Sequence, residues 1–251
     1  VALMAHYDSV AGSPGAADDA AGVAAAIEVA QNIAAEGRPL RDLFLILTDG
    51  EEIGLVGARA FFADQPLAER IGFVVNLEAR GSTGPAVMFE TSLPSDAFIR
   101  VYGDTVKSPR ANSLWADVYR RMPNGTDLTV PLNAGIEGAN IAFLGRQFDY
   151  HSMSATPENL DERSLQQMGE QALAIASHFA NEKEWARGEG NLVYFDVLGM
   201  KLVAYPIYVG WLVLIAAIVI AGAACARLWR VGEITALSSL RAIAEALAVM
   251  L

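Results

Sequence analysis

Several apolar runs in this chain stop at carboxylate or imidazole side chains, and this pattern strongly limits the folds available to it. The first run ends at His6, the second is followed by the pair Glu51 and Glu52, and the third by Glu78. Short apolar runs that end in this way are typical of buried parallel strands. Since the carboxyl ends of such strands meet at one edge of a sheet, the pattern predicts that these side chains gather there.

The segments between these runs favour helices, so that strands and helices alternate along the first part of the chain. The run 42–47 is apolar almost throughout, which favours a central strand buried on both faces. The alternation predicts a three-layer α/β/α architecture with a mixed, mostly parallel central sheet. The predicted strands are 1–7, 42–47, 71–77, 87–91 and 140–144, and the predicted helices are 19–36, 54–64, 95–106 and 160–180.

A second kind of segment follows this domain. Residues 202–226 carry no charged side chain, between Lys201 and Arg227. This length exceeds the roughly 20 apolar residues that cross a bilayer, so we expect a transmembrane helix in contact with membrane lipid. The predicted organisation is a catalytic domain over 1–182, a juxtamembrane linker over 183–201, the membrane helix over 202–226, and a loop with the start of a further membrane segment over 227–251.

Composition excludes several classes of function and site. The net charge of −11 argues against a nucleic-acid partner, because phosphate binding requires a basic face. The single cysteine, Cys225, excludes an internal disulfide framework and a cysteine-rich zinc site. Of the three histidines, His6 and His151 belong to polar clusters, whereas His178 lies in a predicted amphipathic helix and is expected to be structural.

The polar clusters together contain the ligand types of a site for two divalent ions. Such a site needs a carboxylate that bridges ions about 3.5–4 Å apart, and zinc accepts both imidazole nitrogen and carboxylate oxygen. Asp18 could bridge, and His6 and His151 could each bind one ion, as could Glu52 and Glu78. The remaining carboxylate, Glu51, is the candidate general base, which takes a proton from water and gives it to a leaving amine.

Two further residues are candidates for supporting roles. Asp8 lies two positions after His6 and points to the same side in an extended segment, where it could accept the other ring N–H of His6. Tyr150, next to His151, could donate its phenolic hydrogen to a developing oxyanion. Asp19, in contrast, is interpreted as the cap of the following helix.

The order of these motifs resembles the di-zinc aminopeptidase family of metallopeptidases. Its His-x-Asp, Gly-Ala-x-Asp-Asp, Glu-Glu, Asn-x-Glu and Tyr-His motifs match, in order, the following ranges: 6–8, 15–19, 51–52, 76–78 and 150–151. The resemblance implies that Asp18 bridges two zinc ions, that His151 and Glu52 hold one of them, and that His6 and Glu78 hold the other. It covers about residues 1–181, and the family has strands before the first motif that are missing here. The family's aspartate after the last ligand is also absent from His151-Ser152-Met153-Ser154-Ala155.

Glu78 and the following apolar segment resemble the membrane-anchored branch of that family, which includes the endoplasmic-reticulum metallopeptidase and the vacuolar membrane protease. This likeness implies a zinc-dependent exopeptidase, an aminopeptidase, with a peptide substrate and an extracytoplasmic catalytic domain, periplasmic or lumenal. Amino- and carboxypeptidase action stay open, since Arg80 and Arg146 could pair with a substrate carboxylate. Two alternatives also stay open: acyl transfer like that of a glutaminyl cyclase, which needs one zinc ion, and a non-catalytic membrane-tethered relative. Residues 107–135 are expected to contribute to the specificity pocket.

Overall fold

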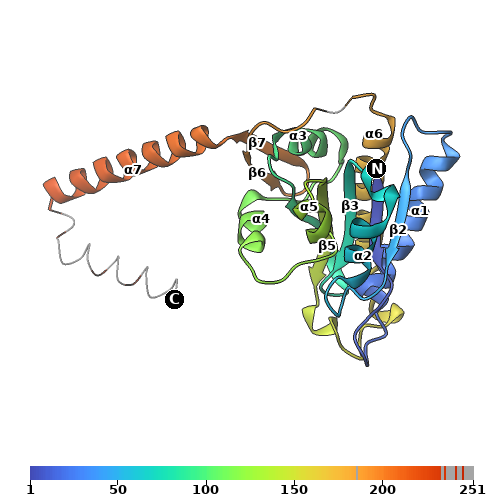
Figure 1. Cartoon of the computed structure of the whole chain (residues 1–251). Coiled ribbons are helices and arrows are strands. Elements are labelled where there is room, and N and C mark those ends of the chain that lie inside the picture. Colours follow the sequence, from blue (N-terminus) through green and yellow to red (C-terminus); the bar gives the residue numbers. More distant parts are fainter. Residues whose placement is uncertain (185, 233–234, 236–240, 242–244, 246–251) are drawn as a thin grey trace. The chain divides into compact units, whose positions relative to one another are not determined.

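The computed structural model describes residues 1–184 and 186–232, together with 235, 241 and 245. The chain divides into two compact units, Val1–Ala204 and Tyr205–Leu251. The first unit is built on a five-stranded sheet (Figure 1). In spatial order its strands are β2 (Phe44–Thr48), β1 (Ala2–His6), β3 (Phe73–Ala79), β5 (Glu137–Gly145) and β4 (Thr83–Thr91).

The sheet is mixed and mostly parallel, as predicted. The pairs β1–β2, β1–β3 and β3–β5 are parallel, and only β4 runs antiparallel, beside β5. Neighbouring residues of a strand point to opposite faces, so that Leu3 and Val75 enter one core cluster while Met4 and Val74 enter another. The sheet is therefore buried on both faces, and the predicted three-layer α/β/α fold is confirmed.

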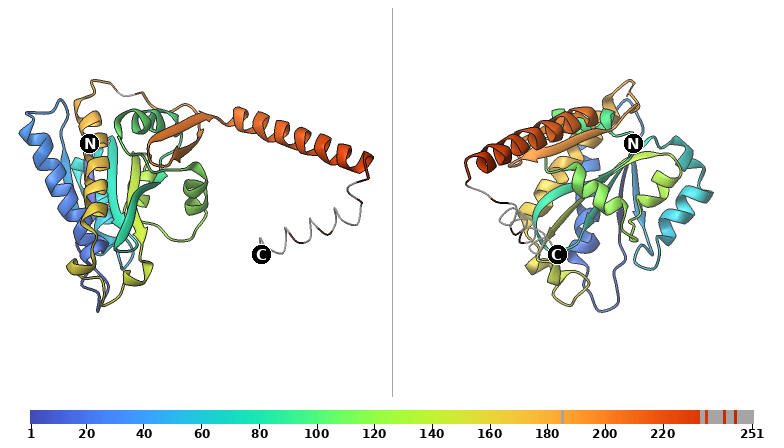
Figure 2. Two further views of the ribbon diagram at one scale, coloured as in Figure 1. Left: turned by 180° about the vertical axis from the view of Figure 1, so that it is seen from behind. Right: turned by 90° about the vertical axis from the view of Figure 1, so that its left-hand side faces the viewer.

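Helices cover the two faces unequally. On the first face α1 (Gly22–Ala35) and α6 (Glu162–Asn181) lie side by side, with α3 (Asp96–Thr105) packed against α6 (Figure 2). This face holds the larger core, in which Phe73 stacks on Phe179 with ring centroids 4.1 Å apart. The second face carries α2 (Val56–Asp64) and α5 (Thr129–Asn133). The helix α4 (Ser113–Arg120) contacts β4. This unit also contains four short helical turns: η1 (Ala16–Ala21), η2 (Pro66–Arg70), η3 (Gln147–Asp149) and η4 (Pro157–Asn159).

The prediction that 42–47 forms a central strand is wrong. Within the described chain, β2 pairs only with β1 and forms an edge of the sheet. Its residues Leu45 and Leu47 are 41% and 38% exposed, whereas Ile46 is buried. A continuous apolar run indicates that both faces of a strand carry apolar side chains, but it does not indicate how many strands pair with it.

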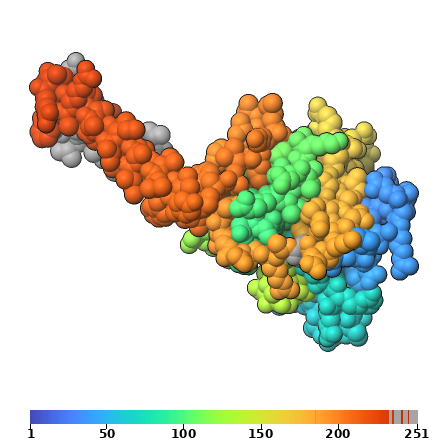
Figure 3. Space-filling model, turned by 90° about the horizontal axis from the view of Figure 1, so that it is seen from above, coloured from blue at the N-terminus to red at the C-terminus, as the bar shows by residue number. Residues whose placement is uncertain are grey.

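The range 183–201, predicted as a linker, contains a strand. The strands β6 (Leu192–Val197) and β7 (Lys201–Pro206) pair in a two-stranded sheet. Residues 202–206, predicted as the start of the membrane helix, therefore belong to a strand instead. Tyr194 and Leu202 are buried, and β6 packs against α3 and α4 (Figure 3). The hairpin therefore belongs to the packed unit, because its apolar side chains add to the larger core.

The second unit contains α7 (Ile207–Arg230), which starts and ends a few residues later than predicted. Within the described ranges, α7 is the one helix whose length and mean hydropathy of 2.5 suit a membrane span. The predicted further membrane segment falls largely outside the described residues.

Candidate metal centre

The carboxyl ends of three neighbouring strands bring the predicted polar residues together. His6 is the last residue of β1 and pairs in register with Thr48, the last residue of β2. Glu51 and Glu52 follow β2 in the next turn, and Glu78 lies near the end of β3. The parallel register therefore places an imidazole and three carboxylates at one edge of the sheet.

Asp18 is shared by two groups of potential metal ligands. Its Oδ1 lies 3.2 Å from Nε2 of His6, and its Oδ2 lies 3.0 Å from Nε2 of His151. Nε2 of His6 is also 3.8 Å from Oε2 of Glu78, and Nε2 of His151 is 2.9 Å from Oε1 of Glu52. Each group thus contains one imidazole, one carboxylate of its own and one oxygen of Asp18, and each is compact enough to surround an ion.

Glu51 lies beside these two groups. Its carboxylate comes within ligand distance of His6 and Glu52, which makes a third compact set. Burial, followed by the nearby carboxylate of Glu78, raises the pKa of Glu51 to about 8. Burial and the carboxylate of Asp18 raise the pKa of Glu52 to about 8. The protein alone therefore leaves these negative charges poorly compensated.

His6 is held between the carboxylates and the backbone of its own strand end. Burial alone would lower its pKa, but the carboxylates of Asp18 and Glu78 raise it above its ordinary value. The ring nitrogen Nδ1 lies 3.0 Å from the backbone carbonyl of Asp8 and 3.5 Å from its carboxylate Oδ1. The residue predicted to orient His6 is thus adjacent to Nδ1, with the backbone oxygen closer than the predicted carboxylate.

The Asp8 carboxylate has a second set of contacts that the sequence did not indicate. Its two oxygens accept hydrogen bonds from the backbone N–H groups of Glu51 and Glu52, at 3.1 and 3.2 Å. Because one carboxylate holds both amides, it fixes the turn that presents both glutamates, and it ties that turn to the strand end at His6.

The position of Asp18 depends on its neighbour. Asp19 is buried and accepts hydrogen bonds from the backbone N–H groups of His6 and Gly22, each at 3.2 Å. This agrees with its interpretation as a cap of the following helix. A β-carbon at residue 22 would overlap the Asp19 carboxylate, so only glycine permits this close approach. The capping contact also fixes the turn from which Asp18 points to the two histidines.

His151 projects from the loop after β5. Its φ of 52° is in the left-handed region, a conformation that costs energy in residues other than glycine and often occurs at functional sites. The ring of Tyr150 stacks on it with centroids 3.6 Å apart. The loop is held by buried Asp149, which accepts hydrogen bonds from Ser82, Ser154 and Arg146. Asp149 therefore supplies support that the sequence, lacking an acid after His151, left unassigned.

The donor set fits zinc. Two imidazoles and three carboxylates, all nitrogen or oxygen donors, converge within two overlapping groups. Oε1 of Glu52 is buried, and although Nε2 of His151 lies 2.9 Å away, the two atoms do not form a hydrogen bond. An ion in each group would neutralise carboxylates that otherwise repel one another.

A hollow of about 540 Å³ opens beside this cluster. Glu51, Glu78 and Tyr150 line it, and apolar side chains of α4 and nearby residues line the rest: Phe89, Leu114, Trp115, Val118 and Met122. The range 107–135 thus contributes to the hollow, and its contribution to a specificity pocket stays a prediction. Arg80 also lines it and lies 5.6 Å above the ring of Tyr150, whereas Arg146 is paired with Asp149. His178 is outside the cluster, on α6 against Phe179.

A comparison with sequence-family models and a comparison with known proteins agree on the family of this chain. The sequence model described as Peptidase family M28 matches residues 1–176. The chain is 33% identical over 213 residues to endoplasmic reticulum metallopeptidase 1 of Mus musculus, covering 82% of this chain and 24% of that protein. It is 34% identical over 206 residues to a vacuolar membrane protease of Eremothecium gossypii, covering 81% and 20%. The chain therefore spans about a fifth to a quarter of the length of these relatives.

Solved structures show the same fold. A zinc aminopeptidase from Bacillus subtilis superposes with a TM-score of 0.57 at 20% identity, covering 74% of this chain and 47% of that one. An aminopeptidase from an Aneurinibacillus strain superposes with a TM-score of 0.56 at 22% identity, covering 75% and 45%.

Proposed function

Because this chain belongs to peptidase family M28, we propose that it is a zinc-dependent exopeptidase, and specifically an aminopeptidase, that acts on peptides. The observation that carries this proposal is the sharing of Asp18 between two ligand groups, each completed by one histidine and one glutamate. In this proposal Asp18 would be shared by two zinc ions. His6 and Glu78 would hold one ion, and Glu52 and His151 would hold the other.

The proposed reaction is hydrolysis of the peptide bond next to a free N-terminus. When bound, zinc polarises the scissile carbonyl and makes water a better nucleophile. Glu51 takes a proton from the attacking water and transfers it to the leaving amine. Its buried position beside Glu78, which raises its pKa, makes it a stronger base than an exposed glutamate once it is ionised. Tyr150 donates a hydrogen bond to the oxyanion that forms at the carbonyl.

The other parts of the chain have consistent roles in this proposal. Asp8 holds the turn of Glu51 and Glu52, and its backbone orients His6. The helix α7 crosses the membrane and contacts lipid, and the peptidase unit lies on the extracytoplasmic side. The relatives named as endoplasmic reticulum and vacuolar membrane proteins support the membrane attachment.

The test is zinc stoichiometry combined with a panel of aminoacyl and N-blocked peptide substrates, measured on the whole chain in detergent. We expect two zinc ions per chain and cleavage only where the N-terminus is free. One zinc ion with cyclisation of N-terminal glutamine would favour the cyclase alternative instead. No turnover with any substrate, despite bound zinc, would favour a non-catalytic relative.

Glu51→Gln tests the proposed base separately. Loss of general base catalysis is expected to reduce kcat by about 10²–10⁴-fold. Zinc content should stay the same, because the ligand groups that share Asp18 remain complete. Unchanged turnover would exclude Glu51 as the base, and loss of zinc would indicate that it is a ligand.

A further inference from the structure

A row of buried polar side chains crosses three neighbouring strands on one side of the metal centre. Asn76 in β3 pairs in register with Asn140 in β5, and Asn140 pairs in register with Glu90 in β4. Both asparagines are fully buried, and Glu90 is 8% exposed. We call these three residues the polar ladder. Buried amides are costly unless they are hydrogen-bonded, and apolar side chains at these positions would pack a sheet equally well.

Hydrogen bonds connect the polar ladder to Glu78. The side-chain nitrogen of Asn140 donates to Oε2 of Glu90 at 2.6 Å and to the hydroxyl of Thr126 at 2.8 Å. The oxygen of Asn140 accepts from the nitrogen of Asn76 at 2.8 Å. The same nitrogen of Asn76 donates to Oε1 of Glu78 at 3.1 Å. The chain of contacts therefore leads from Glu90 to one oxygen of a proposed zinc ligand.

The direction of these bonds follows from Glu90. An ionised carboxylate only accepts hydrogen bonds, so Asn140 must turn its NH₂ group toward Glu90 and its oxygen toward Asn76. Asn76 must then turn its NH₂ group toward both Asn140 and Glu78. The opposite orientation would place the Asn76 oxygen against the carboxylate of Glu78, which is repulsive.

This arrangement leaves one polar atom of Asn76 without a hydrogen bond. Its Oδ1 is buried and has no hydrogen-bond partner among the described residues. The side chain therefore serves through its two N–H groups. Because one of them occupies Oε1 of Glu78, Oε2 remains to face His6, at 3.8 Å from its Nε2.

From these contacts we infer that Glu90 and Asn140 are positioning residues, which act through Asn76 to fix the carboxylate of Glu78 for the ion that it shares with His6. The inference rests on the proposed two-zinc site. It assigns the polar ladder to one ion only, since within the described chain its hydrogen bonds reach Glu78 but not Glu52 or His151.

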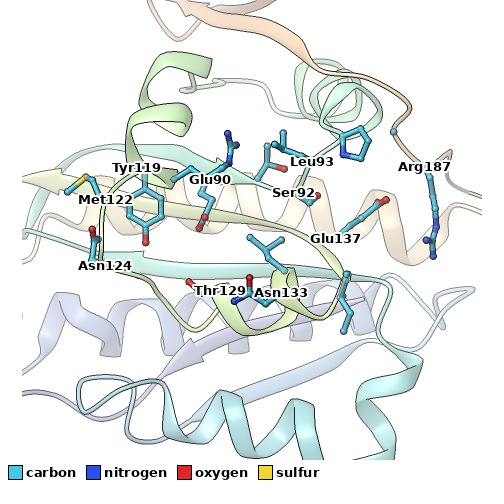
Figure 4. Close-up of a pocket in the computed structure, with 17 residues that line it drawn as sticks. Glu90, Ser92, Leu93, Tyr119, Met122, Asn124, Thr129, Asn133, Glu137 and Arg187 are labelled. Atoms are coloured by element: carbon cyan, nitrogen blue, oxygen red, sulfur yellow. The ribbon is translucent and has the colours of Figure 1, made fainter.

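A second hollow gives a matched control. Glu90 lines a hollow of about 680 Å³, and Glu137, at the start of β5, lines the same hollow without belonging to the polar ladder (Figure 4). Glu90→Lys replaces a hydrogen-bond acceptor by a donor. It should therefore reverse the orientation of the amide groups in the polar ladder. Glu137→Lys makes the same change of charge in the same hollow and should leave the ladder intact.

The experiment measures the affinity of each zinc ion on the whole chain, by competition between the metal-free protein and a chromophoric chelator. Combining each variant with His151→Ala isolates the ion at His6 and Glu78, and combining it with His6→Ala isolates the other. We expect Asn76→Leu and Glu90→Lys to lower the zinc affinity of the position at His6 and Glu78 about 10–100-fold. The zinc affinity of the other position should not change. Glu90→Gln allows both orientations of the ladder, so we expect a loss of only about twofold. Glu137→Lys should change neither affinity.

Other results would overturn the inference. If both ions bind to Asn76→Leu as they do to the unchanged chain, or if both weaken equally, the polar ladder only supports the fold. If Glu90→Lys does not fold, Asn76→Leu, whose side chain has the same branching and the same number of non-hydrogen atoms as asparagine, still decides the question. If the unchanged chain binds fewer than two zinc ions, the proposed function itself is contradicted. This result differs from one in which two ions bind and the ladder variants leave both affinities unchanged, which contradicts only the inference.

Discussion

The Asp8 carboxylate offers a direct test of how the turn after β2 is held at the metal centre. Its two oxygens accept hydrogen bonds from the backbone N–H groups of Glu51 and Glu52. Hydrogen bonds to a charged group contribute about 1.5–3 kcal/mol each. Asp8→Asn keeps one acceptor but places an NH₂ group against the second N–H, so that one of the two bonds is lost.

We expect Asp8→Asn to lower zinc affinity and kcat/KM about 10–100-fold, which corresponds to about 1.4–2.7 kcal/mol. This loss is close to that of one charged hydrogen bond. The assays are chelator competition for zinc and cleavage of a fluorogenic aminoacyl substrate. Asp104→Asn, an exposed acid on α3, is the control and should change neither quantity. Wild-type zinc affinity and kcat/KM in Asp8→Asn would refute the proposed role of the carboxylate.

Three other predictions concern pH, helix packing and the membrane. The two adjacent glutamates after β2 have folded-state pKa values of about 8, above the ordinary 4.5, so the metal-free protein should lose stability as pH rises from about 5 to 8. Urea unfolding with a chelator present measures this loss, and a rise in stability over this range would contradict it. Gly22→Ala should cost about 1–3 kcal/mol and weaken zinc binding by displacing Asp19, whereas Gly169→Ala, which meets no neighbouring atom, should stabilise α6 by about 0.5–1 kcal/mol in thermal unfolding. Ile218→Arg at the middle of α7 should reduce membrane insertion by about 2.5–3.5 kcal/mol, and Leu228→Arg near its end should not; equal extraction of both variants from vesicles would count against a membrane span.

The sequence was most informative where a local pattern carried the structural information. The polar residues that end apolar runs meet at the sheet edge, since parallel strands place their carboxyl ends together. The role of Asp19 as a helix cap was also predictable, because an acid before an alanine-rich segment is a local signal. The order of the motifs was enough to predict that Asp18 lies between His6 and His151.

The remaining features depend on contacts between distant segments. The edge position of β2 and the hairpin after residue 191 follow from pairing and packing, which a short window of sequence does not contain. The polar ladder is another example. Asn140 is an ordinary residue at the start of a predicted strand, and its role emerges only when the register places it between Asn76 and Glu90.

The carboxylate of Asp18 has a consequence for how such a centre would respond to the metal supply. Its two oxygens face different histidines, so an ion on one side would fix the orientation of the oxygen on the other. Occupancy of the two positions would then be thermodynamically linked, with each ion changing the affinity for its partner by the same factor. The free zinc concentration that loads one position would therefore depend on whether the other position is already occupied.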